Sequence, residues 1–352
     1  MRILLLDFTN NFDGQQFNYR FFELLKDKYD IWTAGQEKPK YQIDFSDRNV
    51  FVTAPHKLGV TRETLNPAML HAAMKKIRAI RPDIVFFHTY GLWNLWVMLT
   101  LGRRIKYISY IHAIEPFPGS KHRGLQFLGN WATGVLSTKV VLLSRSSVAP
   151  FLQRYRIHPS KVVYSKYFKD YRPFQPMKTT GRALLFGRLN AYKGLGHLER
   201  IAALCPRVQF DVVGKSDDGM ESQLESLRAL PNVRVVDRYV SRDEMNEFYT
   251  NAEVIVLPYA NASQSGVLWD GYAHSRPGIL FHLKPLDESV EDGKTGFLIP
   301  PGDTGAFAQC LNRFMALPQR EKDAMGRAAW QFGYDNFALE PNLERFVQLL
   351  MN

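Results

Sequence analysis

Two cations lie five residues apart in the stretch FGRLNAYKGL, residues 186–195. Arg188 follows Gly187 and Lys193 precedes Gly194, so each stands where the backbone can come close to a ligand. A departing nucleoside diphosphate accumulates negative charge, and preorganised Arg and Lys donors stabilise that charge without a metal ion. The pair therefore predicts a diphosphate site; the alternative is a solvated basic turn.

A second stretch with chemical potential is LPYANASQSGVLWDGYAHSRPGI, residues 257–279. A buried strand runs into SQSG and then into a helix expected to begin near Val267, and helix amino-terminal amides beside a glycine form an anion site. Asp270 is expected on the first turn of this helix, where its carboxylate can accept two hydrogen bonds from a ribose diol. The alternative for Asp270 is an ordinary helix-start aspartate.

The elements that must position these residues are short apolar strands alternating with amphipathic helices. RILLLDF, then FNYRFFELLKDKY, then DIWTAG read as strand, helix and strand, and a second series begins at RALLFG and continues through VQFDVVG, VRVVD, EVIVLPY and PGILF. A polar, proline-bearing segment at 170–181 separates the two series. The pattern predicts an α/β fold of two doubly wound parallel sheets, with ligands beyond the carboxyl ends of the strands and the active site in the cleft between the domains.

Composition excludes several classes of protein. The 352 residues suffice for two domains, and no apolar run reaches the roughly 18 to 20 residues of a membrane span. MRILLLDF is interpreted as a first buried strand and not as a targeting segment. Two distant cysteines, Cys205 and Cys310, suggest neither a disulfide framework nor a zinc site and fit a reducing cytoplasm. Neither GxGxxG after a strand nor a P-loop lysine motif occurs.

Charge is unevenly distributed along the chain. The formal net charge is +11, and residues 51–180 hold 20 Lys+Arg against 4 Asp+Glu. This segment predicts a surface attracted to phosphates of lipid, nucleic acid or substrate, with ordinary solubilising charge as the alternative. Because no recognition-helix, zinc or RNA-binding signature accompanies the basic residues, no nucleic-acid partner is expected.

The two stretches together resemble the retaining glycosyltransferases of family 4, and the resemblance spans nearly the whole chain. The family pattern has an arginine and a lysine in a GR…KG loop, two glutamates separated by seven residues, and a segment like VEDGKTGFLIPPGD. Arg188 and Lys193 occupy the first, Ala262 and Asp270 stand at the glutamates, and residues 290–303 match the last nearly letter for letter.

This resemblance implies the GT-B fold of two facing Rossmann-like domains. It implies an acceptor-binding domain at 1–172, a nucleotide-sugar-binding domain at 173–334, and a helix at 335–352 that crosses back to the first domain. Arg188 and Lys193 would hold the donor diphosphate and Asp270 the ribose. The amides that would cradle the diphosphate are those of Ser265, Gly266, Val267 and Leu268.

Other positions receive roles from the same resemblance. Ala262 departs from the family glutamate, so Gln264 and Ser265 are expected to serve the donor sugar. YISYIHAIEPFPGS resembles a family HD segment, which places His112 next to the donor sugar as a catalytic residue, with Ala113 replacing the acid; a structural histidine is the alternative. Further candidates are Gly14 for close approach of donor phosphate, Gly214 and Tyr239 for the nucleobase, and His88, Tyr90 and Glu115 for the acceptor.

The function implied is transfer of a hexose from a nucleotide-diphosphate sugar to a glycan hydroxyl, with retention and without a metal or other cofactor. A lipid-linked acceptor in cell-surface polysaccharide biosynthesis is expected. LWNLWVMLTLGRRIKY and GSKHRGLQFLGNW interleave apolar and basic residues, which predicts a cytoplasmic enzyme held peripherally at an anionic membrane, the inner face of the plasma membrane. Core helices of a doubly wound sheet look similar.

Two other functions remain open at this point. A nucleotide-sugar 2-epimerase needs acid and base carboxylates around the sugar ring, and Ala262 and the few acids of the first domain count against it. A non-catalytic GT-B partner subunit that binds nucleotide or glycan is motivated by Ala262, Asp270 and Ala113. Donor turnover by the purified chain distinguishes the enzyme from the partner subunit.

Overall fold

The computed structural model describes residues 1–9, 12–36, 48–55, 60–89, 91–115, 123–166, 168–169, 171–261 and 264–351. The chain forms two compact units. Unit 1 comprises Met1–Phe168 and Asn342–Asn352, and unit 2 comprises Lys169–Pro341. The expected domain ends were residues 172 and 334.

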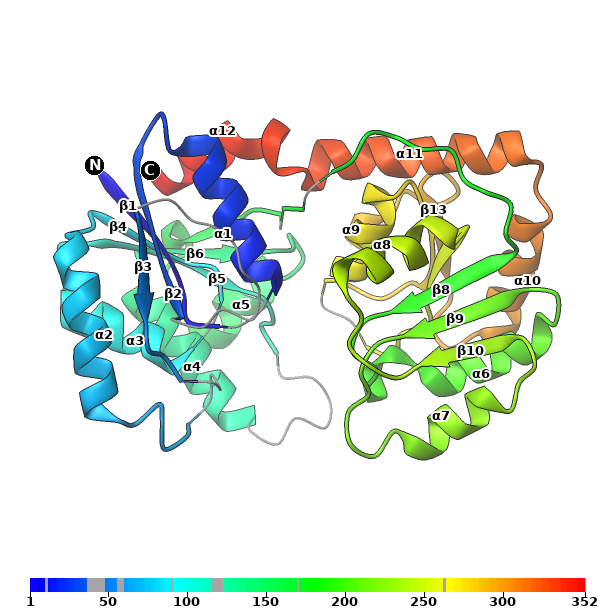
Figure 1. The fold of residues 1–352 in the computed structure, drawn as a ribbon, viewed down its shortest axis with the longest axis horizontal. Coiled ribbons are helices and arrows are strands. Elements are labelled where there is room, and N and C mark those ends of the chain that lie inside the picture. Colours follow the sequence, from blue (N-terminus) through cyan, green and yellow to red (C-terminus); the bar gives the residue numbers. More distant parts are fainter. Residues whose placement is uncertain are drawn as a thin grey trace. The chain divides into compact units, whose positions relative to one another are not determined.

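Unit 1 is built on a parallel sheet of seven strands in the order β3-β2-β1-β4-β5-β6-β7 (Figure 1). The central strands are apolar at nearly every position because both faces of the sheet are covered. The strands are β1 (Arg2–Asp7), β2 (Asp30–Gln36), β3 (Asn49–Val52), β4 (Ile84–Phe87), β5 (Lys106–Ile111), β6 (Lys139–Leu142) and β7 (Val162–Tyr164).

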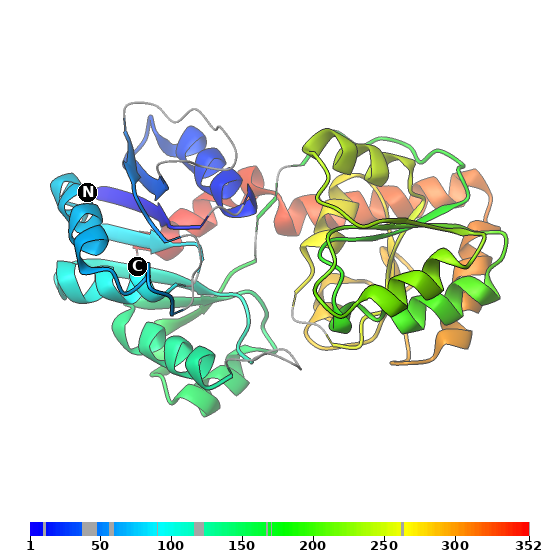
Figure 2. The same ribbon diagram turned by 60° about the horizontal axis from the view of Figure 1, so that its bottom comes forward.

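Helices cover both faces of this sheet (Figure 2). They are α1 (Phe12–Leu25), α2 (Pro67–Ile80), α3 (Leu92–Leu101), α4 (Arg123–Leu136) and α5 (Val148–Tyr155), with a short 3-10 helix η1 (Pro159–Lys161). Leu4, Leu6, Val85 and Phe87 point to the face that packs on α2 and α3. The intervening residue Phe86 points to the other face, where α1 lies.

The end of the chain completes the core of unit 1. Helix α12 (Leu339–Met351) begins at the end of unit 2, and its later residues belong to unit 1. Phe346 is 1% exposed and makes edge-to-face contacts with the rings of Phe17, Phe21 and Phe86, and it stacks on Tyr110. Segments more than 300 residues apart in the sequence therefore share one aromatic cluster.

Unit 2 repeats the architecture with a parallel sheet of six strands, ordered β10-β9-β8-β11-β12-β13. Its strands are β8 (Arg182–Phe186), β9 (Gln209–Val213), β10 (Val233–Val236), β11 (Val254–Leu257), β12 (Gly278–Phe281) and β13 (Gly296–Ile299). Its helices are η2 (Ala191–Lys193), α6 (Leu195–Leu204), α7 (Glu221–Arg228), α8 (Arg242–Asn251), α9 (Gly266–Ala273), η3 (Leu286–Ser289), α10 (Thr304–Met315) and α11 (Gln319–Phe337).

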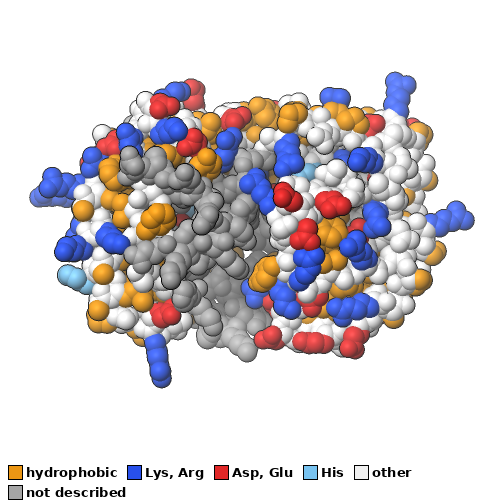
Figure 3. All heavy atoms as spheres, in the orientation of Figure 1, with side chains coloured by type: hydrophobic (Ala, Val, Ile, Leu, Met, Phe, Trp, Pro, Cys, Tyr) orange, Lys and Arg blue, Asp and Glu red, His pale blue; other side chains and the backbone are white. Residues whose placement is uncertain are grey.

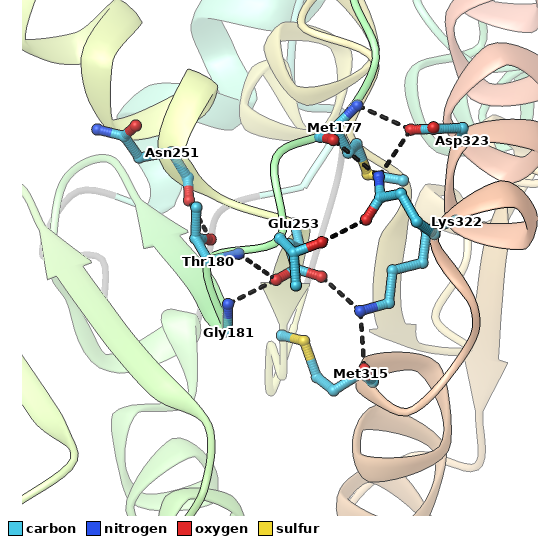
Figure 4. Close-up of polar contacts among 10 residues, drawn as sticks. Met177, Thr180, Gly181, Asn251, Glu253, Met315, Lys322 and Asp323 are labelled. Carbon is cyan, nitrogen blue, oxygen red and sulfur yellow. Dashed lines mark hydrogen bonds and ion pairs between the residues drawn. The ribbon is translucent and has the colours of Figure 1, made fainter.

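A buried ion pair ties helix α11 to the start of the sheet of unit 2 (Figure 4). Glu253, which precedes β11, accepts hydrogen bonds from the amides of Thr180 and Gly181 at 2.7 and 2.5 Å. The Nζ of Lys322 donates to Glu253 at 2.6 Å and to the carbonyl of Met315 at 2.7 Å. Because the oxygens and the ammonium are hydrogen-bonded on several sides, the pair is tolerated in the core.

The prediction of two doubly wound parallel sheets is confirmed. In each sheet the strand order reverses once, between β1 and β4 in unit 1 and between β8 and β11 in unit 2. Such a reversal leaves a crevice beyond the carboxyl ends of the two strands, where ligands of this fold bind. None of the helices in the described part of the chain is long and apolar enough to cross a membrane.

Candidate functional site

The switch point of unit 2 brings Lys193 and Tyr259 together. Lys193 closes the short helix η2 after β8, and Tyr259 follows β11 by two residues. The Lys193 Nζ donates to the Tyr259 hydroxyl at 2.5 Å and to the carbonyl of Phe186 at 3.2 Å. The loop predicted to hold a diphosphate therefore places its lysine beyond the carboxyl ends of the central strands.

Lys193 is a buried cation without an acidic partner in the described part of the chain. It is 4% exposed, and both hydrogen-bond acceptors named above are uncharged. Burial disfavours the ammonium and lowers the pKa of Lys193 to about 7. A bound phosphate would supply the negatively charged partner that this ammonium lacks. Lys193 is therefore the residue best suited to bind an anion.

Glycines allow the loops at this switch point to approach each other. Gly194 has φ 69°, and a Cβ there would lie 1.9 Å from the carbonyl oxygen of Pro258. Gly214, at the end of β9, has φ 147°, and a Cβ there would lie 2.1 Å from the carbonyl oxygen of Gly187. Both glycines thus serve contacts between protein backbones, and the nucleobase role of Gly214 stays a prediction.

Arg188 differs from Lys193 in its surroundings. Its side chain is 70% exposed, and its Nε donates to Asp217 in the loop after β9. The loop is held by backbone hydrogen bonds from Leu189 to Lys215 and from Asp217 to Leu189, at 3.0 and 2.8 Å. The ion pair uses only the Nε, so the two Nη groups of Arg188 can donate to a diphosphate while the pair is kept.

The start of helix α9 lies next to Lys193. Ser265 is buried and caps the helix, accepting a hydrogen bond from the amide of Leu268 at 3.4 Å. A Cβ at Gly187 would lie 3.3 Å from Val267 and 3.4 Å from the Lys193 Nζ, so the three residues surround one small space. The amides of Gly266 and Val267 open the helix, and such amides lack intrahelical acceptors.

Asp270 lies elsewhere than predicted. Helix α9 begins at Gly266, so Asp270 is its fifth residue and lies on the second turn, not on the first. The cap supplied by Ser265 moves the start of the helix one residue earlier than the apolar pattern indicates. The Asp270 carboxylate pairs with the Nζ of Lys169 at 3.2 and 3.3 Å, and both side chains are largely buried.

Lys169 and Tyr259 are residues of this site that sequence reasoning missed. Lys169 is the first residue of unit 2, anchored by its amide to the carbonyl of Phe337 at 2.7 Å. A Cβ at Gly266 would lie 3.6 Å from its Nζ, so a second ammonium stands at the start of α9. No local pattern marks Lys169, since its partner Asp270 lies 101 residues away in the sequence.

The remaining predicted donor residues are spread over unit 2. Gln264 accepts a hydrogen bond from the Ser289 hydroxyl at 3.5 Å. Tyr239 is 73% exposed in the loop before α8. Ala262 lies outside the described residues.

The polar side chains of segment 290–303 are hydrogen-bonded largely to backbone amides within or next to the segment. The Thr295 hydroxyl accepts from the amide of Glu291 at 2.9 Å, and Asp292 accepts from the amide of Leu298 at 2.9 Å. Asp303 caps helix α10, accepting from the amide of Ala306 at 2.8 Å. These three side chains fold the connection from η3 through β13 to α10.

The switch point of unit 1 contains Asp7, Gly14 and His88. Asp7 ends β1 and accepts hydrogen bonds from the Thr9 amide and the Thr89 hydroxyl, both at 2.8 Å. A Cβ at Gly14 would lie 2.4 Å from the Asp7 Oδ2 and 3.2 Å from the His88 Nδ1. Burial raises the pKa of Asp7, which sequence reasoning did not select although it closes the first strand.

His112 joins this cluster, whereas Glu115 pairs with a neighbouring helix. The Nε2 of His112 lies 2.7 Å from the carbonyl oxygen of His88, and the two imidazole rings are 5.5 Å apart. His112 is exposed while His88 is buried. Glu115 forms an exposed ion pair with Arg154 at 3.4 Å. Tyr90 lies outside the described residues.

Across the described ranges, no group of three or more His, Cys, Asp or Glu side chains could hold a metal ion. Cys205 and Cys310 are buried free thiols. The positive groups that the structure places near the start of α9 are Lys169, Lys193 and the helix amides. Arg188 lies on the exposed side of the loop.

Two family models match the chain, one in each unit. The model described as "Glycosyltransferase Family 4" matches residues 24–164, and the model described as "Glycosyl transferases group 1" matches residues 180–316. Together they cover both switch points except the first strand and its loop. The chain belongs to glycosyltransferase family 4. The predicted family is thereby confirmed.

Known relatives agree with this family. The chain is 29% identical over 172 residues to a D-inositol 3-phosphate glycosyltransferase from Streptomyces avermitilis, a match covering 44% of this chain and 37% of that protein. It is 28% identical over 153 residues to an alpha-D-kanosaminyltransferase from Streptomyces kanamyceticus, covering 41% and 39%. The matched part thus spans less than two fifths of each of these curated relatives.

Solved structures establish the fold of this family 4 chain. Sucrose-phosphate synthase from Thermosynechococcus elongatus matches with a TM-score of 0.79 at 16% identity, covering 99% of this chain and 98% of that one. Anabaena HepE, in complex with UDP and glucose, matches with a TM-score of 0.76 at 15% identity over the full length of both chains. The fold is GT-B, as predicted.

Proposed function

We propose that this chain is a retaining glycosyltransferase that moves a hexose from a nucleotide-diphosphate sugar to an acceptor hydroxyl. The observation that carries the proposal is Lys193, a buried ammonium at a switch point that lacks an acidic partner among the described residues. Family membership supports a nucleotide-sugar donor, and the complex of HepE with UDP and glucose is consistent with one.

In the proposed reaction unit 2 stabilises the leaving group. The bond between the anomeric carbon and the phosphate oxygen breaks, and the acceptor oxygen bonds to the same face of that carbon. The acceptor proton passes to the departing phosphate oxygen, so no pair of glycosidase-like carboxylates is required. Lys193 and the first amides of α9 stabilise the charge that develops on the diphosphate, with the Nη groups of Arg188 as further donors.

The proposal requires neither a metal ion nor another cofactor. The Lys193 ammonium and a helix amino terminus supply the positive charge that a divalent cation supplies elsewhere. Asp270 is proposed to accept hydrogen bonds from the ribose, while Lys169 compensates its charge. His112, beside the His88 carbonyl, is proposed to contact the donor sugar.

The acceptor is proposed to be a lipid-linked glycan of cell-surface polysaccharide biosynthesis. Support comes from the 20 Lys+Arg against 4 Asp+Glu in residues 51–180, most of which belong to unit 1. A basic acceptor-binding unit is suited to a substrate anchored in an anionic membrane. The corresponding location is peripheral, at the inner face of the plasma membrane.

The first experiment is thermal unfolding of the wild type and of Lys193→Ala with UDP, GDP, ADP and CMP. A nucleotide at 100 times its dissociation constant adds about 2.7 kcal/mol of stability. We expect one nucleoside diphosphate to raise the Tm of the wild type and of Lys294→Ala, an exposed-lysine control, and not that of Lys193→Ala. Equal shifts in all three proteins would remove Lys193 from the donor site.

The second experiment tests the chemistry with the corresponding nucleotide sugar and a synthetic acceptor. Proton NMR of the product reports the anomeric configuration, and excess EDTA tests metal independence. Inversion, or loss of turnover in EDTA that added divalent metal restores, contradicts the mechanism. Nucleotide binding without turnover of any donor and acceptor pair favours the non-catalytic partner subunit.

A further inference from the structure

Helix α4 presents its apolar residues to solvent. A surface helix of a globular protein normally turns its apolar stripe toward the core. In α4, Leu128 is 58% exposed and Trp131 is 46% exposed, and Leu125 and Val135 are exposed as well. Spacings of three and four residues place these four side chains on one face of the helix.

The buried side of α4 explains why the helix keeps this orientation. Phe127 and Leu136 pack partly buried against the cores of unit 1, and the fully buried positions are Gly129, Asn130, Thr133 and Gly134. The Nδ2 of Asn130 donates to the carbonyl of Ala113 at 3.0 Å and to the Tyr155 hydroxyl at 3.1 Å. A Cβ at Gly134 would lie 2.8 Å from the Ile157 side chain, so the glycine lets α4 pack closely against it. Rotating α4 would break these contacts.

Helix α3 extends the apolar surface. It contacts α4, and its ten residues include no charged side chain. The crossovers β4 to β5 and β5 to β6 advance in the same direction across the sheet, so α3 and α4 lie on the same face. We define the α3–α4 patch as the exposed residues Trp96, Leu99, Leu125, Leu128, Trp131 and Val135.

The segment of chain that carries the α3–α4 patch is strongly basic. Residues 91–165 contain ten Lys+Arg and a single acid, Glu115. Arg103, Arg104 and Lys106 are exposed just beyond the carboxyl end of α3. On the face of unit 1 seen in Figure 3, Lys and Arg side chains are exposed together with apolar side chains and with some Asp and Glu. A second copy of the chain would bring the same positive charge against this surface, whereas an anionic surface complements it.

We propose that the α3–α4 patch docks unit 1 on an anionic lipid bilayer. Leu128 and Trp131 enter the boundary between headgroups and acyl chains, where an indole has its apolar body in lipid and its N–H in water. Arg103 and Arg104 contact headgroup phosphates. The purpose of docking rests on the proposed transfer to a lipid-linked acceptor, because docking keeps unit 1 in the plane of that substrate.

The test is co-sedimentation of the purified chain with vesicles, without donor or acceptor. Wild type should bind vesicles of phosphatidylcholine with phosphatidylglycerol more strongly than vesicles of phosphatidylcholine alone. The variant Leu128→Ser/Trp131→Ser should lose about tenfold or more of its partition coefficient, since two apolar side chains no longer enter lipid. Arg103→Gln and Arg104→Gln should each lose roughly fivefold on the anionic vesicles and little on the neutral ones.

Matched controls separate docking from folding and from catalysis. Leu204→Ser changes an equally exposed leucine of unit 2 and should bind vesicles as the wild type does. In the Leu128→Ser/Trp131→Ser variant, a wild-type calorimetric transition of unit 1 reports that this unit is folded, and the Tm shift with nucleotide reports that unit 2 is intact. The proposal is overturned if the wild type does not bind anionic vesicles, or if the patch variant binds them with the same partition coefficient as the wild type. It is also overturned by a dimer in solution that the patch variant dissociates, because a second copy would then cover the patch.

The proposal and the proposed function can fail separately. If the patch variants weaken vesicle binding but the chain binds no nucleoside diphosphate, docking is upheld and glycosyl transfer is rejected. Nucleotide binding and turnover on a water-soluble acceptor, without any vesicle binding, would do the reverse.

Discussion

At the scale of single residues, the candidate donor site holds two ammonium groups in different electrostatic surroundings. The Nζ of Lys169 lies against the Asp270 carboxylate, whereas that of Lys193 lies against a phenol and a carbonyl. Only Lys193 therefore gains a full charge partner when a diphosphate binds. This difference makes the two lysines separable by experiment.

Nucleotide affinity should depend on pH through Lys193. Its pKa is lowered to about 7 by burial, so the ammonium is lost from the free protein as pH rises above that value. A bound diphosphate holds the proton, so affinity should fall by up to about tenfold per pH unit above about pH 7. Calorimetric titration with UDP, or whichever nucleotide raises the Tm, measures this slope. In Lys193→Met the slope should be absent, and an unchanged slope would exclude the coupling.

The same group should affect stability with the opposite sign. Between a pKa of about 7 in the folded chain and about 10.4 in the unfolded chain, the unfolded chain binds more protons at Lys193. The Lys193 contribution to the free energy of unfolding therefore rises with pH across that window. Chemical unfolding of wild type against Lys193→Met, without nucleotide, isolates this contribution.

Lys169 is expected to position Asp270 rather than to act alone. Lys169→Met leaves the Asp270 carboxylate partly buried beside the start of α9, where it repels a diphosphate. Nucleotide affinity should fall by roughly tenfold or more, about what one buried charge-assisted hydrogen bond is worth. The double variant Lys169→Met/Asp270→Asn removes both charges and should regain part of that affinity. Additive losses in a calorimetric double-mutant cycle would show that the two residues act independently.

At the scale of elements, the sequence predicts strands better than the contacts between loops. RALLFG and VQFDVVG are apolar runs because parallel strands are covered on both faces, and they form β8 and β9 as predicted. The helix beginning near Val267 is also found, at Gly266. The Ser265 cap is a local contact with Leu268, which the apolar pattern alone does not include. The pairing of Lys169 with Asp270 is a tertiary contact, which no local pattern records. Asp270 was therefore placed on the wrong turn, and Lys169 was missed.

Helix α11 should depend on the buried ion pair that ties it to β11. Lys322→Met leaves Glu253 buried without its cation, which typically costs about 3 to 5 kcal/mol of folding free energy. Lys294→Met also breaks an ion pair with a glutamate, but that lysine is 69% exposed, so its loss should cost at most about 1 kcal/mol. Urea unfolding monitored by circular dichroism compares the two variants. Similar midpoints would mean that the buried pair contributes no more than the exposed one.

At the scale of the whole molecule, unit 1 is made from both ends of the chain. Strand β1 supplies its centre, and Phe346 of α12 fills the aromatic cluster with Phe17 and Phe86. Unit 2 is continuous in sequence, from Lys169 to Pro341. The two units should therefore respond differently to changes at the carboxyl terminus.

Removing residues 342–352 should destabilise unit 1 and spare unit 2. The deletion takes away Phe346, and loss of a buried phenylalanine alone costs about 3 to 5 kcal/mol. Calorimetry should show an earlier transition from unit 1 beside a transition that nucleotide still raises, because the residues proposed to bind it belong to unit 2. Phe346→Ala should also lower the transition of unit 1 relative to that of unit 2, but by less than the deletion. Phe51→Ala, at an exposed phenylalanine of unit 1, should leave both transitions as in the wild type. A truncated chain whose nucleotide-dependent transition is also lost would show that unit 2 does not fold without the end of the chain.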